Sequence, residues 1–139
     1  MTDEAETLPG LVEVPQDEAG LLLEAGYFYM ELGRPKEAEE VFTGVSALLP
    51  HSDVPRIALG NLHFAQGRFQ RALKFHQEAL KVRPESATAK AHIGEALLFL
   101  KKEKEGLAAV QEALQMDPDG PSAAFAQALL AAYEDGALR

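Results

Sequence analysis

The sequence predicts an all-α fold: a stack of three helix pairs, closed by one further helix. Two observations predict it. Small residues and prolines recur every 34 residues along most of the chain. Between these markers, apolar residues return at steps of three and four, which is the spacing of one helix face. A repeat of this length holds two helices, and such units bury their apolar faces by stacking on one another.

Five columns of residues keep the 34-residue register. They are Gly26, Gly60 and Gly94; Pro50, Pro84 and Pro118; Ala38, Ala72 and Gly106; Val45, Ala79 and Ala113; and Gly33 with Gly67. The register predicts units at about 19–52, 53–86 and 87–120. The third unit departs from the others because Lys101 stands where they have the glycine between their helices.

Local signals set the expected ends of each helix. The first helices are expected near 18–32, 54–66 and 87–100, and the second helices near 35–48, 69–82 and 103–116. Gly33 and Gly67 suit the left-handed residue that ends a first helix. Pro35 fits the first position of the next helix, and Ser52 and Ser86 are expected N-caps. The repeated prolines stop each second helix, because proline disfavours helical geometry in the residue before it.

Small residues are expected to let the two helices of a unit approach closely. Gly26, Gly60 and Gly94 of the first helices would face Ala38, Ala72 and Gly106 of the second helices.

The two ends of the chain differ from the repeats. A capping helix is expected over about 121–134, beginning at Pro121. Residues 1–17 are expected to form a flexible acidic arm. Within this arm, the apolar stretch LPGLVEVP could instead lie in a groove of the stack.

The quoted repeats carry a family resemblance. LGRPKEAEEVF, QGRFQRALKFHQEALKVRP and GLAAVQEALQMDP resemble the tetratricopeptide repeat family over about residues 19–120. The resemblance implies a right-handed superhelix forming a single domain over 18–139. It also implies that the first helices line a concave face, which is the usual ligand surface in this family.

Composition excludes several classes of function. The formal charge is −9, with six acids and no base in residues 1–18, although residues 53–86 carry +3. This acidity argues against nucleic acid and anionic membranes as partners. There is no Cys, no phosphate-binding loop and no catalytic motif, so we expect no enzyme activity, no cofactor and no metal. The acidic start and the absence of a long apolar run predict a cytoplasmic protein.

Histidine side chains can bind a metal or act as an acid or a base. His63 and His92 lie on neighbouring first helices and could come near each other, as a metal site or an acid–base pair. The favoured interpretation is that both are half-buried or groove-lining polar side chains. His76 stands where an aromatic residue is expected, which indicates a packing role.

Carrying the family's geometry over by register predicts a concave partner-binding face. Its residues are Leu23, Tyr27, Met30, Val54, Ile57, Ala58, Asn61, Phe64, Ala91, His92, Glu95 and Phe99. This mostly apolar lining predicts binding of an apolar or amphipathic protein segment, with Tyr27 and Phe64 as anchors.

The same register argues against one role known in the family. Tetratricopeptide domains that clamp the C-terminal carboxylate of heat-shock proteins use Lys, Arg and Asn at the matching places. Here those places hold Leu23, Tyr27, Ala58, Thr88 and His92, so a free carboxylate would find no cluster of bases.

Two functions remain open. LLLEAGYFYMELGRPKEAEEVF and IALGNLHFAQGRFQRAL look like the repeats of the chaperones of bacterial type III secretion, which hold apolar export substrates. The alternative is a general scaffold or assembly adaptor that self-associates, and homodimers are compatible with the open ends of a repeat stack.

Overall fold

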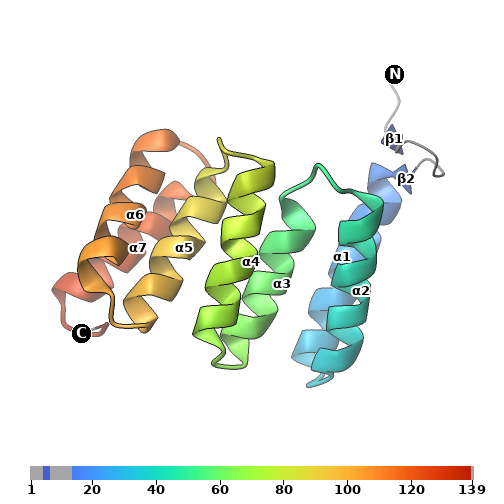
Figure 1. The fold of residues 1–139 in the computed structure, drawn as a ribbon, viewed down its shortest axis with the longest axis horizontal. Helices are drawn as coiled ribbons and strands as arrows, with labels where there is room; N and C mark the ends of the chain where they lie inside the picture. Colours follow the sequence, from blue (N-terminus) through green and yellow to red (C-terminus); the bar gives the residue numbers. More distant parts are fainter. Residues whose placement is uncertain (1–4, 7–13, 139) are drawn as a thin grey trace.

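The computed structural model describes residues 5–6 and 14–138 of the chain. These residues form seven helices: α1 (Gln16–Glu31), α2 (Pro35–Leu48), α3 (Val54–Ala65), α4 (Phe69–Val82), α5 (Ala87–Phe99), α6 (Glu103–Met116) and α7 (Ala123–Glu134). The helices pair in chain order and the pairs stack side by side (Figure 1). The predicted all-α stack of three helix pairs with a closing helix is confirmed.

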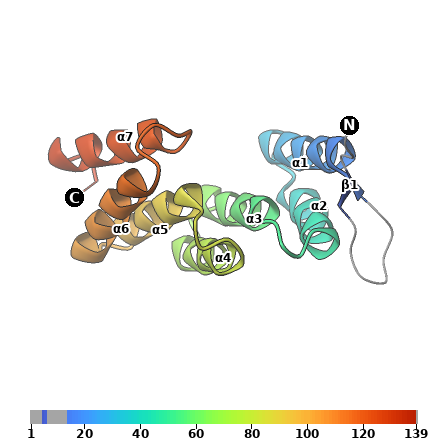
Figure 2. The ribbon, with the colours of Figure 1, turned by 90° about the horizontal axis from the view of Figure 1, so that it is seen from above.

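The stack is curved. Seen from above, α1 and α7 lie at the two ends on the same side of α3 and α5, whereas α4 lies on the opposite side (Figure 2). The first helices and α7 therefore form the concave side of the arc, and the second helices α2, α4 and α6 form the other side.

Part of the predicted arm is ordered by backbone pairing. The short strands β1 (Ala5–Glu6) and β2 (Val14–Pro15) pair antiparallel, and α1 follows directly, beginning two residues before the expected position 18. Most of the apolar stretch LPGLVEVP lies outside the described residues, so its expected place in a groove stays a prediction.

The turns inside the three units share one geometry. Gly33, Gly67 and Lys101 have φ angles of 73°, 77° and 66°. In each turn the N–H of this residue donates to the carbonyl three residues earlier, and the next N–H donates to the carbonyl five residues before itself. The third unit therefore keeps the turn although a lysine occupies it. A left-handed φ costs an L-residue roughly 1–2 kcal/mol.

Replacing Lys101 by glycine is therefore expected to stabilise the protein. We expect Lys101→Gly to raise the free energy of unfolding by about 1 kcal/mol, because it removes this backbone strain. Lys74→Gly, in the exposed interior of α4, is the matched control and should lower it by about 1 kcal/mol. Urea unfolding followed by circular dichroism measures both. Equal losses in the two variants would show that the Lys101 turn is not strained.

One of the two predicted N-cap serines caps its helix, and the other does not. Ser86 caps α5 as predicted, accepting from the Ala89 N–H at 3.1 Å, and its hydroxyl donates to Asp53 Oδ2 at 2.7 Å. The prediction that Ser52 is an N-cap is wrong. Asp53 takes that position with helical φ and ψ, and Ser52 Oγ accepts from the Val54 N–H one residue outside it.

The predicted start of the capping helix is also corrected. Pro121 lies in a turn, in which the Ala123 N–H donates to the Gly120 carbonyl at 3.1 Å, and α7 begins at Ala123.

Large side chains occupy the space opened by the repeated glycines. A side chain added at Gly26 would overlap the ring of Phe42, and one added at Gly60 would overlap the ring of His76. The nearest atoms to these two glycines therefore belong to Phe42 and His76, and not to Ala38 and Ala72, which were expected to face them. At the third member of the column, Gly94, the nearest side chain is Val110, although the Gly106 carbonyl is also in close contact, as predicted. Phe42, His76 and Val110 form a further column with the 34-residue step.

Candidate functional site

Tyr27 of α1 is an exposed aromatic side chain on the concave side. Its side chain is 38% exposed, and its ring packs edge-on against Phe42 with the centroids 5.0 Å apart. Asn61 of α3 donates a hydrogen bond from Nδ2 to the Tyr27 hydroxyl at 3.0 Å. Burial raises the pKa of Tyr27, and the Asn61 hydrogen bond opposes this. The polar tip is thus fixed by the next unit while part of the ring remains open to a ligand.

A second aromatic group joins α3, α4 and α5. The ring centroids of Phe64 and Phe69 are 4.9 Å apart, those of Phe64 and Phe99 are 4.8 Å apart, and those of Phe69 and Phe99 are 5.1 Å apart. Phe99 remains 37% exposed, whereas Phe64 is half-buried among its neighbours. Phe99 is therefore more accessible than Phe64, the other phenylalanine that was predicted for the binding face.

The structure divides the predicted binding residues into three groups. Exposed residues are Tyr27, Val54 and Phe99. Half-buried residues are Leu23, Met30, Asn61, Phe64, His92 and Glu95. Buried residues are Ile57, Ala58 and Ala91.

The prediction is corrected for the three buried residues. Ala58 and Ala91 have no exposed surface, and Ile57 packs in a cluster with Ala79 and Ala89. Buried side chains of this kind are not available to a ligand on the concave side.

A ladder of rings runs from α4 to α7 beneath the concave side. His76 is 1% exposed and stacks on His92 with the centroids 4.8 Å apart, and His92 packs on Phe125 at 4.7 Å. His92 Nδ1 lies 3.2 Å from Glu95 Oε1. Neither ring nitrogen of His76 has a hydrogen-bond partner in the described structure. Burial lowers the pKa of His76 to about 3, and the neighbouring His92 adds to the effect.

The other buried histidine, His63 of α3, contacts residues of α2 and α4. His63 is fully buried and stacks on Phe75 at 5.2 Å, and its Nε2 lies 3.5 Å from Glu39 Oε2. Burial lowers the pKa of His63, and the Glu39 carboxylate opposes this. The considered pairing of His63 with His92 is not what the structure shows, because each ring stacks on a different partner.

The described residues offer neither a metal site nor a membrane-spanning helix. Within the described part of the chain, no three His, Asp or Glu side chains are grouped so that they could hold a metal ion. Across the same ranges, no helix combines the length and apolarity needed to cross a bilayer.

An apolar stripe on α1 was missed by sequence reasoning. Its residues Leu21, Phe28 and Leu32 are 64%, 58% and 53% exposed. They lie seven and four residues apart, which places them on one face of the helix. This apolar surface points away from the core that α1 shares with α2.

The 34-residue register explains the α1 stripe. Phe28 corresponds to Leu62 of α3 and Ala96 of α5, which are 2% and 0% exposed. Leu62 packs in a cluster with Phe42 of α2, and Ala96 packs with Leu73 of α4. The stripe is therefore the face with which later units pack on the preceding unit, and the register in the sequence is the signal that could have found it.

Comparisons with known proteins agree with this fold. Two sequence models described as tetratricopeptide repeat match residues 22–75 and 57–121, which together span the helix pairs. The chain belongs to the tetratricopeptide repeat family.

Sequence relatives of this tetratricopeptide repeat chain are longer proteins. Trafficking protein particle complex subunit 12 of Homo sapiens is 31% identical over 110 residues, which cover 75% of this chain and 15% of that protein. The corresponding protein of Mus musculus is covered to 14%. The chain thus spans about one seventh of the curated relatives it matches.

Solved structures are similar over most of the chain. The translocator chaperone SycD of Yersinia enterocolitica type III secretion has a TM-score of 0.74 at 17% identity, covering 84% of this chain and 90% of that chain. PcrH in complex with the chaperone binding region of PopD has a TM-score of 0.71 at 20% identity, covering 88% of this chain and 93% of that chain. The first tetratricopeptide domain of Spaghetti (RPAP3), bound to the HSP90 peptide SRMEEVD, has a TM-score of 0.70 at 22% identity, covering 85% of this chain and 99% of that chain. At these identities the likeness shows the shared fold.

Proposed function

We propose that this domain is a non-catalytic, cytoplasmic protein-interaction module whose concave face binds an apolar or amphipathic segment of another protein. One observation carries the proposal: Tyr27, Val54 and Phe99 keep 38%, 49% and 37% of their surface exposed, one on each of the three first helices. Large side chains with an apolar surface and a fixed position are the usual anchors of an interface. Two of the similar structures hold a segment of another protein.

The proposed face combines apolar and polar contacts. Tyr27 and Phe99 supply ring surface, while the Asn61 side chain uses its amide N–H toward Tyr27 and keeps its carbonyl oxygen for a backbone N–H of the ligand. Glu95 Oε1 lies 3.2 Å from His92 Nδ1. Because no Lys or Arg stands among the predicted concave residues, an apolar segment fits this face better than a free carboxylate.

The proposal extends to a role as a type III secretion chaperone that holds an apolar client before export. The likeness to SycD and to the PcrH–PopD complex supports it. A dedicated chaperone should co-purify with one stoichiometric client, whereas a general scaffold should bring down several weak partners.

Substitution of two exposed concave rings tests the proposed face. We expect Tyr27→Ala with Phe99→Ala to weaken partner binding by roughly 30-fold or more, because truncated anchor residues each cost about 1–2 kcal/mol or more. The partner would be identified by affinity purification from the native cells and then titrated by calorimetry. The control is Phe28→Ala, which removes a more exposed ring, at 58%, from the α1 stripe.

Two outcomes count against the concave face. Equal affinity of the double variant and the native protein would place the ligand elsewhere. Equal loss with Phe28→Ala would show a general effect of exposed apolar area. Phe64→Ala is a poorer test, because Phe64 packs between Phe69 and Phe99 and its removal should lower stability.

The second candidate function is a self-associating scaffold, and the α1 stripe is the observation that favours it. We infer that two copies join through Leu21, Phe28 and Leu32, since exposed apolar patches of this kind mark association surfaces. Similarity to a subunit of a multi-subunit trafficking complex also fits an assembly role.

Charge placed on the α1 stripe tests self-association. We expect Phe28→Lys with Leu32→Lys to convert a dimer into a monomer in sedimentation experiments, because lysines cannot be buried unpaired. The concave variant Tyr27→Ala with Phe99→Ala is the control and should remain dimeric. A native protein that is monomeric at all concentrations, or a dimer that survives the lysines, would contradict this assignment.

A further inference from the structure

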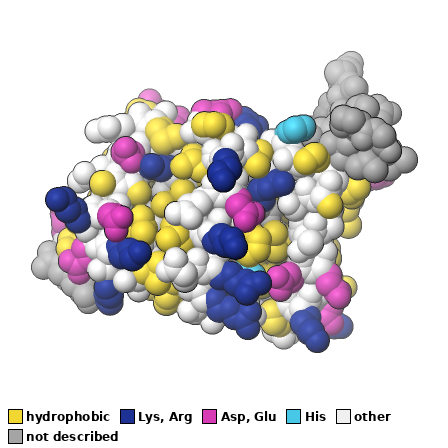
Figure 3. Space-filling model, viewed as in Figure 1, with side chains coloured by type: hydrophobic (Ala, Val, Ile, Leu, Met, Phe, Trp, Pro, Cys, Tyr) yellow, Lys and Arg dark blue, Asp and Glu magenta, His cyan; other side chains and the backbone are white. Residues whose placement is uncertain are grey.

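The second-helix side carries a basic ridge along α4, defined by Arg68, Arg71, Lys74 and Lys81. All four side chains are exposed, in a chain whose formal charge is −9. Figure 3 shows Lys and Arg side chains gathered over α4 in the middle of this face. Among the described residues no carboxylate forms an ion pair with them, whereas other cations such as Arg83 are paired.

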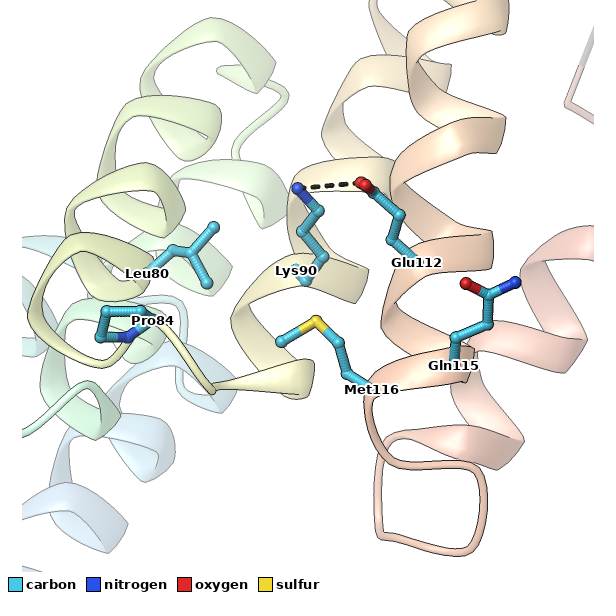
Figure 4. A pocket seen from close by; sticks show the side chains of 6 residues that line it. All are labelled: Leu80, Pro84, Lys90, Glu112, Gln115 and Met116. Carbon is cyan, nitrogen blue, oxygen red and sulfur yellow. Dashed lines mark ion pairs between the residues drawn. The ribbon is translucent and has the colours of Figure 1, made fainter.

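A notch lies beside one end of this ridge. It has a volume of about 360 Å³, and Leu80, Pro84 and Met116 supply its apolar surface. Figure 4 shows Leu80 and Pro84 on one side of the notch and Met116 on the other, with Lys90 and Glu112 joined above them. Lys90 Nζ lies 3.1 Å from Glu112 Oε1. The Met116 side chain is 41% exposed. This volume is at the small end of ligand pockets, and it admits a side chain of a bound segment.

The ridge and the notch are continuous along α4. Lys81 follows Leu80 in the last turn of the helix, and Lys74 lies seven residues earlier on the same face. A second hollow, of about 650 Å³, is lined by Gln70, Arg71, Lys74, Phe75, Gln77 and Glu78. The surface therefore offers a polar track that carries more positive than negative charge and leads to a notch with a partly apolar wall.

We propose that this surface binds an acidic segment of a partner protein, with an apolar side chain in the notch and carboxylates beside Lys74 and Lys81. Charge complementarity carries the choice of ligand, because unpaired cations in an acidic protein attract an acidic chain and orient it. Nucleic acid fits less well, since it offers no apolar side chain for Leu80, Pro84 and Met116 of the notch. This site is separate from the concave face and does not depend on it.

A peptide titration tests the site. The probe is a short fluorescein-labelled peptide in which glutamates flank one central leucine, and its binding is followed by anisotropy at low salt. We expect Lys74→Glu with Lys81→Glu to weaken binding more than about tenfold, because two attractions become repulsions. The control is Lys102→Glu with Lys104→Glu, which makes the same change of net charge at the opposite end of α6 from Met116. This control should change the affinity about twofold or less.

Two further probes separate the parts of the site. A peptide with serine in place of the leucine should bind about fivefold more weakly, because it leaves the notch empty. The concave variant Tyr27→Ala with Phe99→Ala should bind the acidic peptide like the native protein. Circular dichroism checks that every variant keeps its helices.

Four outcomes would overturn the proposal. Equal loss in the two lysine variants would mean that the peptide responds only to net charge. Loss in the concave variant would place the peptide on the other face. Tighter binding of a single-stranded oligonucleotide, abolished by Lys74→Glu with Lys81→Glu, would assign the ridge to nucleic acid. A native dimer dissociated by the same substitutions would assign it to a second copy of the chain.

Discussion

Gly60→Ala is expected to lower the free energy of unfolding by about 3 kcal/mol. The added Cβ would overlap three atoms of the His76 ring. That ring is 1% exposed and stacked on His92, so it cannot move aside into solvent. Overpacking of this kind costs typically 1–3 kcal/mol and occasionally more.

Gly44→Ala provides the matched control. Gly44 lies inside α2, is exposed, and has no neighbouring atom within 4 Å of an added Cβ. The same methyl group should therefore stabilise the protein by about 0.5–1 kcal/mol, which is the usual gain when alanine replaces glycine in a helix. Urea unfolding of both variants measures the difference.

A double variant locates the strain. Gly60→Ala combined with His76→Ala should be more stable than the sum of the two single effects predicts, because the methyl group then occupies part of the space vacated by the ring. Additive effects, or a loss for Gly44→Ala as large as that for Gly60→Ala, would contradict the close contact.

Mild acid is expected to destabilise the protein through His76, and His76→Phe should remove most of this effect. The pKa of His76 is about 3 in the folded state, against 6.5 for a free histidine. Below pH 6.5 the unfolded chain therefore binds a proton that the folded chain excludes, so stability falls as the pH drops from 6.5 toward 3. The loss between pH 7 and pH 5 should be about 2 kcal/mol, and the full loss is bounded by about 5 kcal/mol.

Phenylalanine is the replacement that the repeat itself indicates. Phe42 occupies the equivalent position of the first unit, opposite Gly26, just as His76 lies opposite Gly60. His76→Phe should also raise stability at pH 7 by about 1–3 kcal/mol, because both His76 ring nitrogens are buried without hydrogen bonds. Denaturant titrations at pH 7, 6 and 5 measure both effects.

The pH profile has a control and a clear negative result. His51→Phe makes the same substitution at an exposed histidine and is the control. Burial also lowers the pKa of His63, so a smaller loss with the same sign should remain in His76→Phe. A profile of His76→Phe that is identical to the native one would show that His76 does not carry the acid sensitivity.

The sequence determined the helices because their ends are coded locally. The bounds 35–48, 69–82 and 103–116 agree with α2, α4 and α6. Proline and glycine act on their own backbone and on the adjacent residue, so these signals need no tertiary partner. Ser52 and Pro121 were misassigned because each lies in a turn whose shape depends on neighbouring hydrogen bonds.

The resemblance to the tetratricopeptide repeat family predicted which helices line the concave side, but neither it nor the 34-residue register could say which side chains remain open. Tyr27 and Ala58 were both assigned to the face, yet one is 38% exposed and the other 0%. Exposure depends on what packs above each residue, and a single sequence states only which positions are equivalent.

Equivalence by sequence and equivalence by packing therefore differ at the ends of the stack. Phe28, Leu62 and Ala96 share one column, but Phe28 alone is exposed. Leu62 of α3 is covered by α2, and Ala96 of α5 is covered by α4. Within the described residues, no preceding unit covers Phe28 of α1 in this way. Similarly, Lys101 adopts the φ of its glycine counterparts because the stacked helices on either side impose the turn. The sequence by itself determined the repeat and the helices, and the family resemblance indicated the side of the candidate site. Only the tertiary structure decided which residues are open to a partner, since burial arises from contacts between units far apart along the chain.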